Sequence, residues 1–501
     1  MAYMYLFYSL LVVLSSWIRW HFTGSLKADD NFIYEPSYAL WLCVALYHIG
    51  IIGMSYTLYN IVVQNENYRI SKSQTIRISV LSILLFTGMT VMFASDIYTY
   101  LAEGELLTRG ILTYTDGSLV RQSKFIDYVS DWWKECPNHY GSPLLFLFGV
   151  ACYTGKTLFK SYIVFKLILM LIGILLINLV SKIENTLPEK KYNFFALAIL
   201  SPILLIEGIG QTHVEIVITT LLAAAILSMN YKKIYFAAFF IGLAMACKIM
   251  YGIILLPLLI SLAYASNRAE NKKWMNFFFS ALSCVAICVL IVVLSYIPIW
   301  QGIETITNPI SYHGTKTPSR SYTEILILIN RYGSELIRNG LSIPDLLLRA
   351  QQPDFNSISE AIRQKNKIAP FFSILGLLIA AWNLLPLIAV KKVNSVYYYF
   401  AKLWIIIITI YSPIFNPWYF MPIILLMIYS QKLSWIFYLT VITSISINYQ
   451  IGNTIAPNSY LNILVSFNMI LMLILFMYKF KKHFIIEPYI ELRNLLTNKS
   501  Y

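Results

Sequence analysis

Apolar runs long enough to form membrane-crossing helices recur along most of the chain. A helix needs about 20 predominantly apolar residues to cross the hydrocarbon core of a bilayer. The runs alternate with polar loops, so the pattern predicts an all-α, polytopic transmembrane helical bundle of about 12–14 spans. The runs cover residues 2–20, 39–63, 76–94, 158–181, 193–207, 213–229, 234–248, 250–265, 274–297, 370–390, 396–412, 418–430, 434–448 and 460–480.

Composition excludes two broad classes of protein. Of the 501 residues, 58% are apolar and only 12% are charged, whereas roughly 25% of the residues in a soluble domain are charged. A set of soluble domains joined by polar linkers is therefore excluded. The net charge of +14 is explained by basic cytoplasmic loops. The expected partner is the lipid bilayer, and no nucleic acid is expected.

Lysine and arginine orient the spans, because short loops rich in these residues face the cytoplasm. With both termini inside, the runs above place all such loops on that side. The loops carry Arg69, Lys72 and Arg77; Lys182, Lys190 and Lys191; Lys232 and Lys233; Arg268, Lys272 and Lys273; Lys391 and Lys392; and Lys479, Lys481 and Lys482. Two long segments, 95–142 and 298–369, then lie on the external side.

This topology divides the chain into spans and external loops. Residues 143–155 are apolar but short, and we expect them to dip into the membrane and return. Long loops on a helical bundle are where function is expected. The expected parts are N-terminal spans (1–94), a first external loop with the re-entrant segment (95–157), a central transmembrane bundle (158–297), a large external loop (298–369) and C-terminal spans with a cytoplasmic tail (370–501).

Asp96 lies where a long apolar run meets the first external loop, with Tyr98 and Tyr100 close by. A carboxylate at that depth is partly shielded from water and still within its reach, which suits a general base. The alternative is a helix cap, because Ser and Asp are both good N-cap residues.

The same loop continues with carboxylates and an arginine among aromatic residues. Glu103, Glu105 and Arg109 are the charged members. Sugar sites combine rings under the apolar sugar face with carboxylates that accept from its hydroxyls. Tyr and Trp also gather at membrane interfaces, so the aromatic residues alone do not distinguish the two interpretations.

Ionisable residues further along the chain sit between or within apolar runs. Glu207 and His213 frame a glycine-containing turn, and Lys248 interrupts an apolar stretch. Such residues at membrane depth are a functional hypothesis by default. His213 could bind a metal ion or be a hydrogen-bonded structural residue. Lys248 could bind an anionic phosphate or extend to the external interface.

Two more clusters fall at the same membrane face as Asp96. The large external loop carries a cationic group beside aromatic residues, and an aromatic turn broken by prolines lies between two C-terminal runs. The residues are His313, Lys316 and Arg320 in the loop, and Trp418 and Tyr419 in the turn.

The order of these motifs resembles the GT-C superfamily of integral-membrane glycosyltransferases. A run ending in Asp-x-Tyr-x-Tyr is followed by a stretch with Gly and Arg, and then by Tyr140-Gly141-Ser142-Pro143. The turn with His213, the segment with Lys248 and Pro417-Trp418-Tyr419 come later. The likeness covers most of residues 76–430. It is similar to bacterial mannosyltransferases that depend on polyprenyl-phosphate mannose, and to those of glycolipid-anchor synthesis.

The resemblance implies a GT-C-type fold and an inverting hexosyltransferase. The sugar, mannose in the similar enzymes, would pass from a polyprenyl-phosphate carrier to a glycan or glycolipid acceptor. The site would face outward from a bacterial plasma (inner) membrane. The family's catalytic carboxylate maps onto Asp96, as general base. The residues implied for the donor phosphate are Lys248, Arg320, His313 and Lys316; those for sugar or acceptor are Tyr98, Tyr100, Glu103, Glu105, Arg109, Tyr140, Glu207, His213, Trp418 and Tyr419.

The first external loop departs from one family pattern. Many members carry a paired acidic motif there, and Glu103-Gly104-Glu105 is the nearest match in this sequence. A divalent-metal requirement therefore stays open, although the similar members imply no metal and no cofactor.

Two other classes of protein remain possible from the sequence. A transporter or flippase for lipid-linked sugars would share the basic and aromatic residues, but it would not need a base at Asp96. A polysaccharide polymerase or ligase would also be polytopic with a large external loop, and it would depend on external Arg and His.

The topology can be tested by labelling. A Cys introduced at Ser118 or Ser334, in a variant lacking the native cysteines, should react with a membrane-impermeant thiol reagent in intact cells or spheroplasts. The reason is that both long segments are predicted to be external. Labelling only after permeabilisation would overturn this topology.

Overall fold

All regular elements in the described part of the chain are helices, so the predicted all-α bundle is confirmed. The computed structural model describes residues 1–23, 38–63, 70–92, 96–130, 133–187, 194–270, 274–308, 378–379, 381–389, 393–407, 417–429 and 490. The α-helices are α1 (Ala2–Thr23), α2 (Tyr38–Val63), α3 (Lys72–Thr87), α4 (Asp96–Thr108), α5 (Ser142–Gly155), α6 (Leu158–Asn185), α7 (Phe194–Ile199), α8 (Glu215–Asn230), α9 (Ile234–Cys247), α10 (Gly252–Ala269), α11 (Trp274–Tyr296), α16 (Val393–Ile406) and α17 (Met421–Tyr429).

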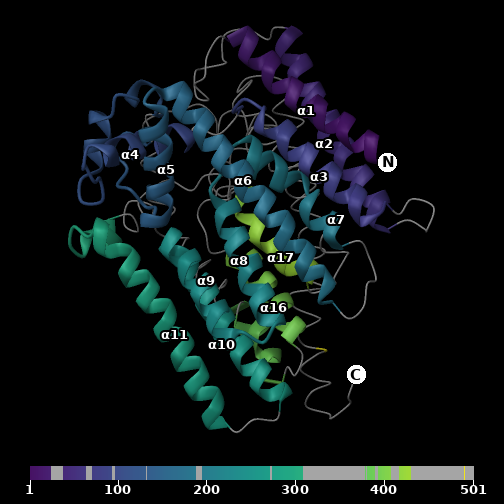
Figure 1. The fold of residues 1–501 in the computed structure, drawn as a ribbon, viewed down its shortest axis with the longest axis vertical. Helices are drawn as coiled ribbons and strands as arrows, with labels where there is room; N and C mark the ends of the chain where they lie inside the picture. Colours follow the sequence, from purple (N-terminus) through teal and green to yellow (C-terminus); the bar gives the residue numbers. More distant parts are fainter. Residues whose placement is uncertain are drawn as a thin grey trace, which may run out of the picture.

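Two groups of helices flank a central pair. α1 packs against α2 and α3, and α9 packs against α10 and α11; Figure 1 shows these groups at opposite edges of the bundle. α6 and α8 lie between them, since α6 contacts α3 and α8, and α8 contacts α9 and α17. α4 and α5 pack on each other at one end of α6. This arrangement brings the ends of α3, α8 and α9 toward the α4–α5 region.

The helices are those of a membrane protein. Within the described residues, four helices are long and apolar enough to cross a bilayer, namely Ala2–Phe22, Leu158–Asn185, Ile249–Ala269 and Trp274–Ile299. α11 leaves large apolar side chains exposed along its length, such as Leu282, Val289 and Val293. Lipid covers such a surface without the cost that water would impose. The runs expected at 434–448 and 460–480 lie outside the described residues.

The run at 193–207 does not form the single span that hydropathy predicts. α7 ends before Pro202, and the chain continues as a π-helix, η5 (Leu204–Gly210), which is bent by 119° from α8. Proline has no N–H and disfavours helical backbone at the residue before it. The break after α7 therefore has a local cause, and η5 and α8 form a bent pair in place of a straight helix.

Residues 143–155, expected to dip into the membrane and return, belong to one continuous helix, α5 (Ser142–Gly155). The chain reverses at residues 155–157 and begins α6, which packs beside α5. Gly155 permits this close turn, because a Cβ there would meet the backbone of Ser161. The depth of α5 in the bilayer stays a prediction.

α3 ends at Thr87, and residues 88–92 continue as irregular backbone toward the start of α4. Irregular backbone within a helical bundle must find hydrogen-bond partners, because lipid offers none. Side chains of α1 supply some of them. Trp17 Nε1 donates to Gly88 O (2.9 Å), and Arg19 Nη1 donates to Val91 O (2.9 Å).

Other partners of the same segment come from later in the chain. Lys166 of α6 donates from Nζ to the carbonyl oxygens of Thr87 (3.1 Å) and Met89. The amide of Met92 donates to Gln211 Oε1 (3.0 Å), which lies just after η5. Residues 88–92 are thus fixed by three separate parts of the chain, a few residues before Asp96 in the sequence.

The two external segments of the predicted topology meet in the structure. Gln301 Nε2 donates to Leu112 O (3.4 Å), and Asn308 Nδ2 donates to Thr115 O (3.1 Å). The start of the large loop therefore lies on the first loop, as a shared side of the membrane requires. The identity of that side stays a prediction.

Lys166 can be tested as a support of residues 88–92. Lys166→Met should lower the free energy of unfolding by about 1–3 kcal/mol, because buried carbonyls would lose their donor. Thermal unfolding of the purified protein in detergent measures this. Lys160→Met changes an exposed lysine of the same helix and is the matched control. Equal effects of the two substitutions would contradict the role of Lys166.

Candidate active site

The turn between η5 and α8 carries two signs of a specialised site. Glu207 lies in the π-helix η5. This form is rare in proteins as a whole, but where it occurs it is often at a functional site. Thr212 has a φ of +66°, which is an outlier for a β-branched residue. Strain of this kind persists where the surrounding structure imposes it, and it clusters at functional sites. The amide of His213 donates to Glu207 O (2.9 Å), so the turn ties these two residues together.

His213 lies between two carboxylates. Its Nε2 is 3.2 Å from Glu207 Oε2, and its Nδ1 is 3.7 Å from Asp96 Oδ2. The exposed fractions of the side chains are 0% for His213, 2% for Glu207 and 16% for Asp96. Only Asp96 of the three retains appreciable access from outside the protein.

Asp96 is the first residue of α4. A carboxylate in the first turn of a helix is stabilised by the helix dipole, which gives Asp96 a structural role at the start of α4. The N-cap position itself is the preceding residue. The Asp96 side chain also faces His213, a contact that such a structural role does not require. The geometry therefore permits a chemical role as well as a structural one.

Lys248 interrupts the helical conformation between α9 and α10. It adopts an extended conformation directly after α9, and its Nζ lies 3.2 Å from Glu215 Oε1. The same Nζ stands 5.4 Å from the ring centre of Tyr140 and 5.1 Å from that of Tyr419. Lys248 is buried in this cluster, so it does not extend to the interface as one interpretation of the sequence suggested.

Tyr140 joins the first loop to this cluster. The next residue, Gly141, donates from its amide to Cys247 O (2.9 Å), at the end of α9. A Cβ at Gly141 would collide with Ala246 O, so the close approach requires glycine. Burial raises the pKa of Tyr140 well above its usual range, and nearby Asp96 adds to the effect. Tyr140 is thus a neutral phenol beside the carboxylates.

Tyr100 supports this ring from α4. It packs edge-on against Tyr140, with ring centres 5.2 Å apart, and stacks on Phe148 of α5 at 4.8 Å. Tyr98 instead contacts the ring of Tyr128 at 6.0 Å. Both tyrosines are buried; Tyr100 lies against the ring of Tyr140, and a sugar-binding role for either stays a prediction.

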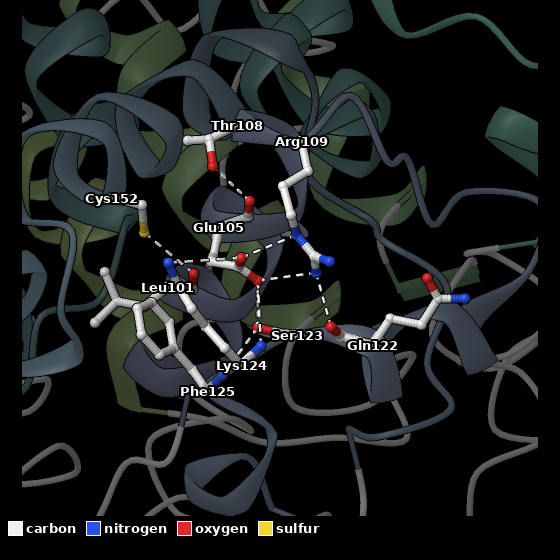
Figure 2. A network of polar contacts seen from close by, with 9 residues as sticks. All are labelled: Leu101, Glu105, Thr108, Arg109, Gln122, Ser123, Lys124, Phe125 and Cys152. Atoms are coloured by element: carbon white, nitrogen blue, oxygen red, sulfur yellow. Dashed lines mark hydrogen bonds and ion pairs between the residues drawn. The ribbon is translucent and has the colours of Figure 1, made fainter.

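Glu105 and Arg109 form a separate network along α4 (Figure 2). Arg109 Nε lies 2.9 Å from Glu105 Oε1, and Glu105 Oε2 accepts from Ser123 Oγ (3.0 Å) and from the amide of Lys124 (3.3 Å). Glu105 is nine residues beyond Asp96, or about 13.5 Å along the helix axis. The network holds the first loop on α4, apart from His213.

Glu103 has a similar structural environment. Both of its carboxyl oxygens lie within 2.8 Å of Thr113 Oγ1, and the side chain is buried. Burial raises the pKa of Glu103 to about 8, although hydrogen bonds from Thr113 and Asn138 oppose the shift. A sugar-binding role for Glu103, Glu105 and Arg109 stays a prediction, and their contacts here are with the protein itself.

The remaining predicted residues are only partly described. His313, Lys316 and Arg320 lie outside the described residues, as does the side chain of Trp418. In the described part of the chain, no group of three or more His, Cys, Asp or Glu side chains is arranged to hold a metal ion.

The structure brings two further residues into the site. Glu215, the first residue of α8, pairs with Lys248, and Tyr251 Oη lies 3.5 Å from the same carboxylate. A signal for Glu215 was present, since a lysine within an apolar stretch needs an anionic partner. Tyr251 had none, because tyrosine is common at every membrane interface.

Comparison with known families shows which family the chain belongs to. Residues 6–265, more than half of the chain, match the MptA_B family, described as alpha-(1->6)-mannopyranosyltransferase, N-terminal domain. The chain belongs to this family. No curated protein and no solved structure matches the chain. The mannosyltransferase region contains Asp96, Glu207, His213, Glu215 and Lys248.

The predicted resemblance is thus confirmed for the family and for mannosyltransferase character. The enzyme is a membrane glycosyltransferase whose polar cluster lies where α4, α8 and α9 converge. Tyr419, which lies over Lys248, comes from beyond the matched region.

The raised pKa of Glu103 predicts a pH-dependent stability. Between pH 4.5, the ordinary pKa of a glutamate, and about pH 8, its pKa in the folded protein, Glu103 binds a proton on folding. Protonation of Glu103 therefore contributes to the free energy of unfolding. This contribution is complete below the lower value and is lost as the pH rises toward 8, at up to about 1.4 kcal/mol per pH unit. Glu103→Gln should therefore gain stability relative to the wild type as the pH rises from 5 to 8.

Thermal unfolding in detergent across this range measures the effect. Glu135→Gln, which alters an exposed carboxylate of the same loop, should leave the pH dependence unchanged. Parallel curves for Glu103→Gln and the wild type would refute the assignment.

Proposed function

We propose that the enzyme transfers mannose from a polyprenyl-phosphate carrier to a glycan or glycolipid acceptor, with inversion at the anomeric carbon. The single observation that supports it most is Asp96, a partly exposed carboxylate held against buried His213 within a mannosyltransferase-family region. We place the reaction at the external face of a bacterial plasma membrane, where the predicted topology puts the first loop.

Asp96 acts as the general base in this proposal. It takes the proton of an acceptor hydroxyl, whose oxygen attacks the anomeric carbon, and the carbon–oxygen bond to the donor phosphate breaks with its electrons leaving on the phosphate. An inverting transfer of this kind needs one base and a good leaving group. A hydrolase acting on a glycoside would need an additional acid. The scheme requires no metal ion.

Lys248 stabilises the leaving phosphate in the proposal. Its charge is directed inward, between two aromatic rings and beside Glu215. A donor phosphate would approach the same Nζ and compete with the Glu215 carboxylate for it. Fixed cations aimed at developing negative charge are among the strongest catalytic contributions of a protein. Arg320, His313 and Lys316 are proposed to contribute from the large loop.

Asp96→Asn separates this proposal from its rivals. Asn caps a helix about as well as Asp but cannot take a proton, so transfer should fall by about 10²–10⁴-fold while donor binding survives. The assay follows labelled mannose from polyprenyl-phosphate mannose to an α-mannosyl glycolipid in proteoliposomes. Expression and thermal stability serve as controls.

The other outcomes are informative. Near-normal transfer by Asp96→Asn would remove Asp96 from the mechanism. Movement of the labelled donor across the bilayer without transfer, equal in both proteins, would favour the flippase interpretation instead.

A further inference from the structure

Glu207 and His213 are enclosed by the protein. Both side chains are buried, and they lie behind Asp96 as seen from the solvent-accessible part of the site. A sugar could not touch either residue without displacing the turn that holds them. Asp96, His213 and Glu207 form a row, and Asp96 is the one member of it whose side chain is accessible from outside the protein. Any part that Glu207 and His213 take in catalysis must therefore act through Asp96.

We propose that Glu207 is a positioning residue: it orients His213 so that Nδ1 faces Asp96, and His213 takes up the proton that Asp96 receives from the acceptor. This inference rests on the proposed function, because it assumes that Asp96 is the base. It gives Glu207 and His213 a different role from the sugar contact implied by the family resemblance.

The geometry of the ring supports this role. The two nitrogens of an imidazole lie on opposite edges, and here each faces a different carboxylate. The partner of one nitrogen determines which tautomer and orientation the other presents. Glu207 Oε2, at 3.2 Å from Nε2, is the nearer carboxylate oxygen. In the proposal its negative charge favours the tautomer with the proton on Nε2, which leaves the Nδ1 lone pair directed at Asp96.

The backbone holds Glu207 and His213 close together, and burial of the His213 ring restricts its rotation. The amide of His213 donates to the carbonyl oxygen of Glu207, and the preceding residue, Thr212, is held in a left-handed conformation. The amide of Gln211 also donates to Ile206 O (2.6 Å). The π-helix and the strained turn therefore fix the carboxylate and the ring as one unit, which is costly for a purely structural histidine.

The proton can be followed through the row. The acceptor hydroxyl loses its proton to the Asp96 carboxylate as its oxygen bonds to the anomeric carbon. The donor phosphate leaves with the electrons of the broken bond. The proton then passes from Asp96 to Nδ1, so that an imidazolium stands between two carboxylates and Asp96 is a carboxylate again. The longer contact, 3.7 Å to Asp96, is the place where this proton is received; such contacts tighten when substrate binds.

A double-mutant cycle tests whether Glu207 acts through Asp96. Glu207→Gln keeps the size of the side chain and removes its charge. It should lower kcat by about 10- to 100-fold, as do residues that orient a reacting ligand, and leave the KM for polyprenyl-phosphate mannose within about 2-fold. In an Asp96→Asn background, the same substitution should have no further effect beyond about 2-fold, because the residue it acts through is already lost.

Two further variants make the test independent of folding. Glu184→Gln removes another buried carboxylate, which lies near the end of α6 and pairs with Lys72 of α3. This substitution should change the stability of the protein without changing kcat of the folded enzyme. His213→Gln repeats the cycle from the other side of the contact, and rates are normalised to folded protein by thermal unfolding.

The outcomes separate the two levels of the argument. High activity of Asp96→Asn would overturn the proposed function. Loss of activity in Asp96→Asn with normal kcat in Glu207→Gln would overturn only the positioning role. Effects of Glu207→Gln that multiply with those of Asp96→Asn, or that appear only in KM, would overturn it as well.

Discussion

Irregular backbone inside a helical bundle must be hydrogen-bonded by the protein, and the architecture of this enzyme follows from how that requirement is met. Residues 88–92 leave the helical path, and α1, α6 and the residue after η5 supply their partners. The turn at 211–214 leaves it as well, and is closed by its own backbone. Because Gln211 belongs to the turn and binds Met92, the two irregular segments fix each other, and the polar cluster forms where they meet.

Buried charge obeys the same rule within this cluster. Each ionised side chain in it faces an opposite charge, a ring or a polar group, since an isolated charge in an apolar interior is strongly unfavourable. Lys248 meets Glu215 and two tyrosine rings. Three carboxylates, those of Asp96, Glu207 and Glu215, share two possible cations, Lys248 and His213. In the proposed mechanism, this excess of carboxylates surrounds the base that takes the acceptor's proton.

The sequence predicted the fold where hydropathy alone decides it, and failed where tertiary contacts do. The bounds of α1, α2 and α11 follow the apolar runs closely, because lipid requires length and apolar surface. Asp96, His213 and Lys248 could be found because charge in or beside an apolar run is expensive. The π-helix and the 119° bend between it and α8 could not be predicted, because no pattern of apolar and polar residues marks them in the sequence. The ion pair of Glu105 with Arg109 was predictable, because residues four apart on a helix are neighbours. The sugar-site interpretation did not take this spacing into account.

One wall of the polar cluster comes from outside the region that defines the family. The matched region ends at residue 265, whereas the second ring over Lys248 is that of Tyr419, and α17 packs on α8 directly after it. Met421 fills the space beside Gly208 of the π-helix. The family region alone therefore lacks one wall of the polar cluster, which Tyr419 and α17 supply. A substitution near Tyr419 or in α17 can therefore change the surroundings of Lys248, although it lies outside the region by which the family is defined.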